Sequence, residues 1–235
     1  MERCVYCLAE FDKLTTDHVI PRSWYPKTTP ENLEKYQAPV CRECNNKYSR
    51  LEAELLTVFA LCTPPETAAT KGVVEPVMRS LKPQLASTDR ERENRMKKIV
   101  KLQKNMRIYE DYKDIPHESV YPNFGIQHDL EYDQYDAVFL NKESLEIFLE
   151  KVIRGLTYRL NNKYIESSHE ITIYPPSNDC EKIFEPILKK WGETFERGKG
   201  LTIIRALPPD DPVSSIWKII LWEQFVAYVV VSPIE

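Results

Sequence analysis

The residues best suited to chemistry in this chain are four cysteines. They form two pairs with the same spacing, Cys4-Val-Tyr-Cys7 and Cys41-Arg-Glu-Cys44. Two such pairs supply the four thiolates of a tetrahedral structural zinc ion, with Zn–S distances of roughly 2.3 Å. Because four ligands complete its coordination, this ion would stabilise the fold and take no part in catalysis.

A second set of polar residues lies between and just after these pairs. Asp17 and His18 stand side by side before Val-Ile-Pro, and Asn45 and Asn46 follow Cys44 directly. A histidine with a pKa near about 6.5 suits general-base chemistry at neutral pH. Carboxylate and amide oxygens suit Mg²⁺ or Mn²⁺. On an extended segment, Asp17 and His18 would point in different directions.

Taken together, these motifs resemble the zinc-stapled branch of the HNH endonucleases. The resemblance covers residues 1 to about 55. It rests on Cys-x2-Cys, on Asp-His-Val-Ile-Pro-Arg-Ser, and on Cys-x2-Cys-Asn-Asn followed by Ser-x2-Glu (Ser49 to Glu52). It implies a ββα-metal core, in which two strands and a helix hold a catalytic divalent ion.

The resemblance also implies roles for single residues. His18 would take a proton from the attacking water, and Asp17 would bind Mg²⁺ or Mn²⁺. Asn45 matches the second metal ligand, with Asn46 as a close alternative; one of the two would instead cap the helix. Asn32 is the candidate for the asparagine that orients the histidine, although it lies farther from the second cysteine pair than in the usual pattern.

Other residues are weaker candidates. Arg22 and Lys47 could contact the scissile phosphate. Ser49 and Glu52 fall on the helical face of Asn45, where they could support the metal site or simply be solvated.

The function implied by the resemblance is metal-dependent hydrolysis of DNA phosphodiester bonds, giving a 5′-phosphate and a 3′-hydroxyl. One site cuts one strand, so cutting a duplex requires a second visit or a homodimer. A role in defence against foreign DNA is a family-level expectation. Two alternatives stay open: an RNA-directed nuclease, and a non-catalytic zinc-ribbon protein that binds nucleic acid or a partner protein.

Composition sets the broad class of the protein. The 235 residues are 42% hydrophobic with a net charge of −4, an ordinary globular composition. No apolar run approaches the roughly 20 residues that span a bilayer. Six cysteines, four of them in metal spacing, predict a reducing cytoplasm. We expect no signal peptide and inert thiols at Cys62 and Cys180.

Charge is distributed unevenly along the chain. Residues 79–107 carry ten basic and three acidic side chains, a local charge of +7, whereas residues 110–150 carry −9. A polyanion would meet the first segment and avoid the second. The candidate nucleic-acid contacts in this segment are Lys97, Lys98, Lys101 and Lys104. Alternatively, these lysines form ion pairs with the acidic stretch that follows.

These residues must be positioned by an α+β fold, an N-terminal ββα-metal module followed by a mixed α+β domain. We expect a nuclease module over 1–62, a linker and basic helix over 63–115, and an α+β domain over 116–235. The first predicted helix begins at Asn45 or Asn46 and stops at Thr63-Pro64-Pro65, and a short helix follows at 77–81. A third covers 89–108 and points Met96, Ile99, Val100 and Met106 inward. The last two cover 142–160 and the segment from Ser177 or Asp179 to Gly198. The predicted strands are 170–174, 201–206, 216–221 and 225–231, the last two as a hairpin, while residues 110–136 should form loops with short strands.

Overall fold

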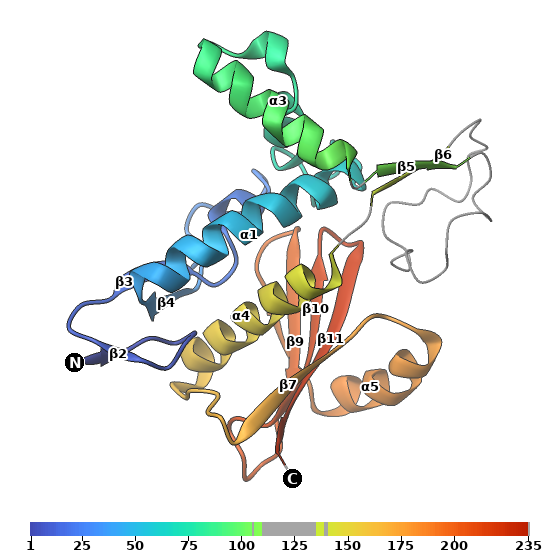
Figure 1. Cartoon of the computed structure of the whole chain (residues 1–235). Helices are drawn as coiled ribbons and strands as arrows, with labels where there is room; N and C mark the ends of the chain where they lie inside the picture. Colours follow the sequence, from blue (N-terminus) through green and yellow to red (C-terminus); the bar gives the residue numbers. More distant parts are fainter. Residues whose placement is uncertain (105, 110–134, 139–140, 235) are drawn as a thin grey trace.

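The computed structural model describes residues 1–104, 106–109, 135–138 and 141–234 (Figure 1). Its fold is mixed α+β, as predicted, with a cysteine cluster at the N-terminal end and a five-stranded sheet in the C-terminal part. The loops expected over 110–136 fall mainly outside these residues. Within the described ranges, no helix is long and apolar enough to cross a membrane.

The N-terminal part is built from two small hairpins and a long helix. Strands β1 (Glu2–Arg3) and β2 (Glu10–Phe11) pair with each other, as do β3 (Thr15–His18) and β4 (Gln37–Val40). A 3-10 turn, η1 (Arg22–Trp24), follows β3. Helix α1 (Arg42–Leu61) follows β4 at once, so β3, β4 and α1 form the expected ββα arrangement.

Helix α1 begins earlier than predicted. Its N-cap is Cys41, whose sulfur accepts a hydrogen bond from the Cys44 N–H, so Asn45 and Asn46 lie inside the first turns. Cysteine is not among the usual capping residues, which is why the sequence pointed to the asparagines instead. The predicted end holds, because the helix stops at Leu61, before the two prolines.

The segment after α1 forms an arm that projects from the body of the molecule (Figure 1). At its base α2 (Val74–Ser80) packs on α1, with Val74 and Val77 buried, and beyond it lie η2 (Pro83–Leu85) and α3 (Asp89–Gln103), which is capped by Thr88. Helix α3 ends before Ile108, and a strand, β5 (Met106–Tyr109), pairs with β6 (Tyr135–Val138).

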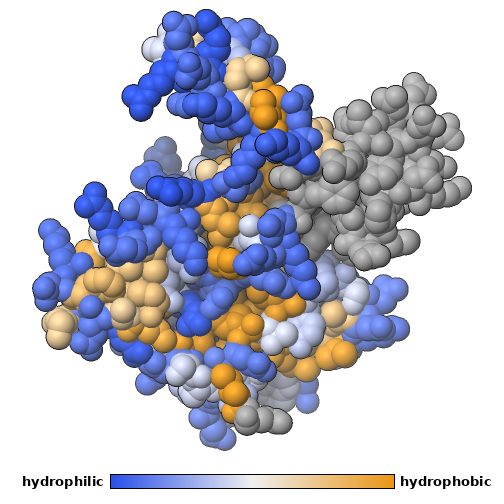
Figure 2. Space-filling model, viewed as in Figure 1, coloured by the Kyte–Doolittle hydropathy of each residue, from blue (hydrophilic) through white to orange (hydrophobic). Residues whose placement is uncertain are grey.

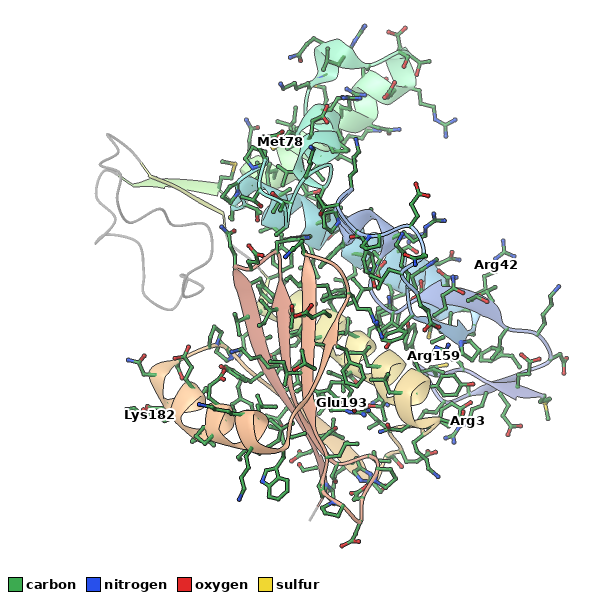
Figure 3. All side chains as sticks on the ribbon, turned by 180° about the vertical axis from the view of Figure 1, so that it is seen from behind. Arg3, Arg42, Met78, Arg159, Lys182 and Glu193 are labelled. Carbon is green, nitrogen blue, oxygen red and sulfur yellow. The ribbon has the colours of Figure 1, made fainter. Side chains whose placement is uncertain are left out.

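The predicted inward face of α3 is wrong. No residue of α3 is buried, and Met96 and Val100 are 47% and 48% exposed. Periodicity indicated an amphipathic helix, but the arm brings no large element against that face. Figure 2 shows mainly hydrophilic side chains over the arm, and Figure 3 shows them standing out into solvent when the molecule is seen from behind.

Helix α4 (Lys142–Asn161) confirms the strongest helix prediction. Asn141 caps its start by accepting from the Ser144 N–H at 3.0 Å. Its apolar stripe is fully or almost fully buried and consists of Leu145, Phe148, Leu149, Val152, Ile153 and Leu156.

The C-terminal sheet is antiparallel, with strand order β7-β11-β10-β9-β8. Its strands are β7 (His169–Tyr174), β8 (Glu193–Glu196), β9 (Leu201–Ala206), β10 (Ser215–Leu221) and β11 (Phe225–Pro233). The predicted hairpin is present as β10–β11. Strand β8 was not predicted, since helix α5 (Asn178–Trp191) ends before Gly192 and not at Gly198.

The two faces of the sheet carry different cores. Alternate residues such as Ile203, Trp217 and Val229 face the large cluster shared with α1 and α4. The intervening residues pack with Phe184 and Leu188 of α5 in a smaller cluster. Helix α5 thus covers one face of the sheet, and α4 lies on the other (Figure 1).

An aromatic cluster joins the N-terminal part to the sheet. The Trp24 ring lies 4.6 Å from Phe148 and 5.5 Å from Trp222, centroid to centroid. The Trp222 indole N–H also donates to the Trp24 carbonyl at 2.9 Å. Trp222 adopts φ of 52°, an uncommon value for a bulky residue, so its burial against Trp24 fixes this turn.

Candidate functional site

Four cysteine sulfurs meet where β1, β2 and the start of α1 converge. The Sγ atoms of Cys4, Cys7, Cys41 and Cys44 all lie within 4.8 Å of one another, and those of Cys7 and Cys41 are 3.9 Å apart. Sulfurs about 3.8 Å apart are what a tetrahedron with Zn–S bonds of about 2.3 Å requires. All four cysteines are free of disulfides. The donor set and its spacing therefore fit a structural zinc ion.

Backbone groups support this cluster. The Cys41 N–H donates to the Cys4 sulfur at 3.3 Å. Burial raises the pKa of the Cys4 thiol, but backbone N–H groups of Cys7, Cys41 and Tyr6 outweigh it, so that pKa is lowered overall. Burial raises the pKa of the Cys41 and Cys44 thiols. A bound cation would supply the positive charge that four neighbouring thiolates need.

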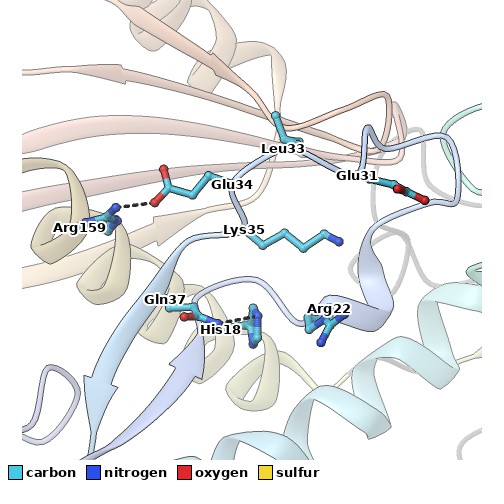
Figure 4. Close-up of a pocket in the computed structure, with 8 residues that line it drawn as sticks. All are labelled: His18, Arg22, Glu31, Leu33, Glu34, Lys35, Gln37 and Arg159. Atoms are coloured by element: carbon cyan, nitrogen blue, oxygen red, sulfur yellow. Dashed lines mark hydrogen bonds and ion pairs between the residues drawn. The ribbon is translucent and has the colours of Figure 1, made fainter.

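His18 lies at the end of β3 and lines an open pocket of about 470 Å³ (Figure 4). The remaining lining residues are Arg22, Glu31, Leu33, Glu34, Lys35, Gln37 and Arg159. Arg159 is paired with Glu34, while Arg22 and Lys35 extend toward the space beside His18 in Figure 4. The pocket therefore places Arg22 and Lys35 beside the imidazole, with Glu31 as the remaining acidic residue of its lining.

Two features set the state of this imidazole. Its pKa is lowered from the ordinary value, first by partial burial and then by the charge of Arg22, against a smaller opposing effect of Asp17. Its Nε2 atom lies 2.9 Å from the amide nitrogen of Gln37, the residue paired with it across β3 and β4. The lowered pKa favours the neutral imidazole of His18, which lies beside the Gln37 amide.

Gln37 occupies the place that sequence reasoning gave to Asn32. The structure does not bring Asn32 to His18: it is exposed in the loop before β4. The strand register could have identified Gln37, because a residue directly opposite His18 in an antiparallel pair lies close to it.

Asp17 points to the other side of β3, as expected for neighbours on a strand. It is buried, with an exposed fraction of 8%. Its Oδ2 accepts from the Tyr6 hydroxyl at 3.0 Å and lies 2.9 Å from the Lys151 ammonium. No described residue hydrogen-bonds to its Oδ1, which leaves one carboxylate oxygen for an external cation.

Asn45 lies near this face of β3. Its amide nitrogen donates to the Thr15 hydroxyl at 3.2 Å, and its Oδ1 accepts from Ser49 at 3.5 Å. Thr15 and Asp17 share a strand face because they are two residues apart. Asn46 is exposed on the next position of the helix. Of the two asparagines, Asn45 is thus the one that contacts β3, through Thr15.

Glu52 and Lys151 form the most buried part of this region. Glu52 is buried, not solvated, and its Oε1 lies 2.5 Å from the Lys151 ammonium, which is fully buried. Lys151 was not among the residues predicted from the sequence. A signal existed, because Lys151 continues the apolar stripe of α4 from Phe148, and a charged residue on a buried helix face needs a partner.

The other candidate contacts lie apart from this cluster. Lys97, Lys98, Lys101 and Lys104 are exposed on or just after α3, and Lys101 pairs with Glu54 of α1. Lys47 is exposed on α1, 5.4 Å from the ring of Tyr48. Only Arg22 among the predicted phosphate contacts shares the pocket of His18.

Comparison with known families agrees with this geometry. Residues 4–51 match the family model of the HNH endonuclease. The matched range contains both cysteine pairs, β3, β4 and the first half of α1. Neither a search of curated proteins nor a search of solved structures gives a match. The chain therefore carries an HNH endonuclease domain at its N-terminal end, a class whose members are generally nucleases.

Proposed function

We propose that this protein is a metal-dependent endonuclease that hydrolyses phosphodiester bonds of DNA, with His18 as the general base. The observation that carries the proposal is the position of His18 in an open pocket with Arg22 and Lys35, inside the range that matches the family model. The side chain of the neighbouring Asp17 is buried on the opposite side of β3. We further propose that residues 1–62 act as the nuclease module, residues 63–115 as the linker and basic helix, and residues 116–235 as its supporting domain.

The state of His18 suits it to take a proton from water. A neutral imidazole is required for this step, and the lowered pKa of His18 favours that form. The amide of Gln37 can turn by 180° so that its oxygen accepts the Nε2 proton. Nδ1 would then carry the free lone pair that receives the proton of the attacking water.

Arg22 and Lys35 would bind the scissile phosphate. Both are cations at neutral pH, and both line the pocket beside His18. Arg159 is already paired with Glu34, so it adds less charge to the open space. Binding of a phosphate between these cations would bring its phosphorus within reach of a water held by His18.

The metal ligands in this proposal are Asp17 through Oδ1 and Asn45 through its amide oxygen. When bound, Mg²⁺ or Mn²⁺ would neutralise charge on the phosphate and on the leaving 3′ oxygen. Tyr6 and Lys151 hold the other oxygen of Asp17 and so fix the direction of the carboxylate. The zinc ion held by the four cysteines has a structural role.

Substrate binding beyond the cut site is assigned to the arm. Helix α3 is exposed and basic, so its lysines could follow a phosphate backbone. Cleavage of both strands would then require two copies of the chain or two successive binding events, because the proposal gives each chain one active site. A role in defence against foreign DNA stays an expectation from the resemblance.

The test is incubation of the purified protein with plasmid DNA and with RNA, in Mg²⁺, in Mn²⁺ and in a chelator. We expect nicked or linear DNA in the presence of metal, and intact DNA in its absence. Cleavage of RNA alone would support the RNA-directed alternative. Failure to cut either substrate under all conditions would favour the non-catalytic zinc protein.

A further inference from the structure

A fully buried lysine from outside the matched domain reaches into the candidate site. Lys151 lies in the second half of α4, and its ammonium contacts groups from β3 and α1. The acceptors are Asp17 Oδ2 at 2.9 Å, Glu52 Oε1 at 2.5 Å, the His18 carbonyl at 2.7 Å and the Val19 carbonyl at 3.2 Å. An ammonium has three N–H donors, so these acceptors satisfy it completely.

The charges of this cluster depend on Lys151. Burial raises the pKa of Glu52, and Lys151 opposes that rise, while nearby Asp17 adds to it. Without the ammonium, two carboxylates would lie buried near each other with no counter-charge. Breaking a buried ion pair by removing one partner is strongly unfavourable. The Lys151 ammonium is therefore the buried counter-charge that contacts both the Asp17 and the Glu52 carboxyl groups.

An independent feature of the same helix face points to the same contact. Gly155 lies one turn after Lys151, and a Cβ at this position would come within 2.7 Å of Cγ2 of Val19. The side chain of Val19 is fully buried there. Two successive turns of α4 thus contact the backbone or side chains of residues 18–19, and glycine is what allows the close approach.

We propose that Lys151 is a positioning residue of the nuclease site: its ammonium fixes the Asp17 carboxylate and the peptide that carries His18. This inference rests on the proposed nuclease function. Its consequence is that α4, which lies outside residues 4–51, completes the site. The supporting domain then sets the distance between the general base and the metal ligands.

The first experiment compares Lys151→Met with Lys142→Met. Lys142 lies at the exposed start of the same helix, with 85% of its side chain accessible, so its loss is a matched control. For both variants and the wild type, we would measure zinc content, thermal unfolding with and without Mn²⁺ in the absence of substrate, and kcat and KM for a DNA substrate.

We expect Lys151→Met to keep zinc, to keep KM, and to lose about 10²-fold in kcat, because a small misplacement of reacting groups has effects of that size. We also expect Mn²⁺ to raise its unfolding temperature more than that of the wild type. A divalent ion would then supply the positive charge that Asp17 and Glu52 have lost, whereas a lysine that acts only through packing would leave the metal response unchanged.

A second variant covers the case in which two uncompensated carboxylates prevent folding. Lys151→Met combined with Glu52→Gln removes one charge of each sign and so keeps the net charge of the cluster. We expect it to fold with zinc and still to have a reduced kcat. Failure of both variants to fold with zinc would show that the lysine serves only stability and would overturn the proposal.

Wild-type kcat in Lys151→Met, or equal Mn²⁺ shifts in Lys151→Met and Lys142→Met, would also overturn it. Failure of the proposed nuclease function can be distinguished from failure of the Lys151 proposal by the activity of the wild type. If the wild type cuts neither DNA nor RNA, the nuclease assignment fails, while the Mn²⁺ shifts without substrate still report whether Lys151 is the counter-charge of Asp17.

Discussion

Asp17 and His18 are neighbours in the chain, yet they serve opposite sides of β3. Asp17 is buried and bound to Tyr6 and Lys151, whereas His18 opens into the cationic pocket and is held by Gln37. The alternation of side chains on a strand produces this separation. The proposed function assigns the metal ligand and the general base to these two neighbouring residues.

The cysteine cluster predicts about one tightly bound zinc ion per chain. Cys41→Ser should lose zinc and solubility, because Cys41 is both a ligand and the cap of α1. Cys62→Ser is the matched control, since this thiol lies outside the cluster and burial raises its pKa to about 11. Elemental analysis measures the metal. Folded wild-type protein without stoichiometric zinc would rule out the four-thiolate site.

The two asparagines after Cys44 should behave differently. Asn45→Ala should raise the Mg²⁺ or Mn²⁺ concentration needed for half-maximal cleavage, because its side chain lies beside Thr15 on β3. Asn46→Ala, at an exposed position, should leave this concentration unchanged. Metal titrations of the cleavage rate test the pair. The reverse result would assign the ligand to Asn46.

Cleavage should persist at mildly acidic pH. The active form of His18 is the neutral imidazole, so the rate rises with pH through the pKa of His18. Because burial and Arg22 lower this pKa, the midpoint of the acidic limb of kcat/KM should lie below about 6.5. Arg22→Gln removes one of these causes and should move the midpoint upward. Lys13→Gln, at an exposed loop position, should not move it. A midpoint that is identical in all three proteins would exclude His18 as the titrating base.

The arm should bind DNA through charge. Replacing Lys97, Lys98, Lys101 and Lys104 with glutamine should weaken binding for all sequences alike and flatten the salt dependence by up to about 0.9 per lost phosphate contact. Replacement of four exposed lysines elsewhere, Lys163, Lys182, Lys189 and Lys190, serves as the control. Equilibrium binding at several salt concentrations gives both slopes. Equal slopes in the two variants would assign the α3 lysines to pairing within the chain, as Lys101 pairs with Glu54.

Local patterns in the sequence were enough to predict much of the fold. Helix α4 follows from its apolar period, and the β10–β11 hairpin from two strand patterns with a short connection. The spacing of the cysteines predicted the zinc cluster, because tetrahedral coordination by four thiolates restricts how the ligands can be spaced. Each of these features depends on residues that are close in the sequence or on one dominant interaction.

The contacts that were missed join residues far apart in the chain. Gln37 reaches His18 through strand register, and Lys151 reaches Asp17 across 134 positions through the packing of α4. The exposed α3 is a related case, because its apolar residues were assigned a partner that the fold does not supply. Tertiary packing decides all three, and a single sequence carries little information about it.

The central claim is that His18 is the base of a nuclease, and single-turnover cleavage by His18→Ala tests it most directly. His169→Ala is the control, since it removes an imidazole from β7 in the C-terminal sheet. With zinc content and unfolding temperature unchanged, we predict a loss of about 10²–10⁴-fold in rate for His18→Ala and wild-type cleavage for His169→Ala. A cleavage rate near that of the wild type in His18→Ala would contradict the account and place the chemistry elsewhere in the protein.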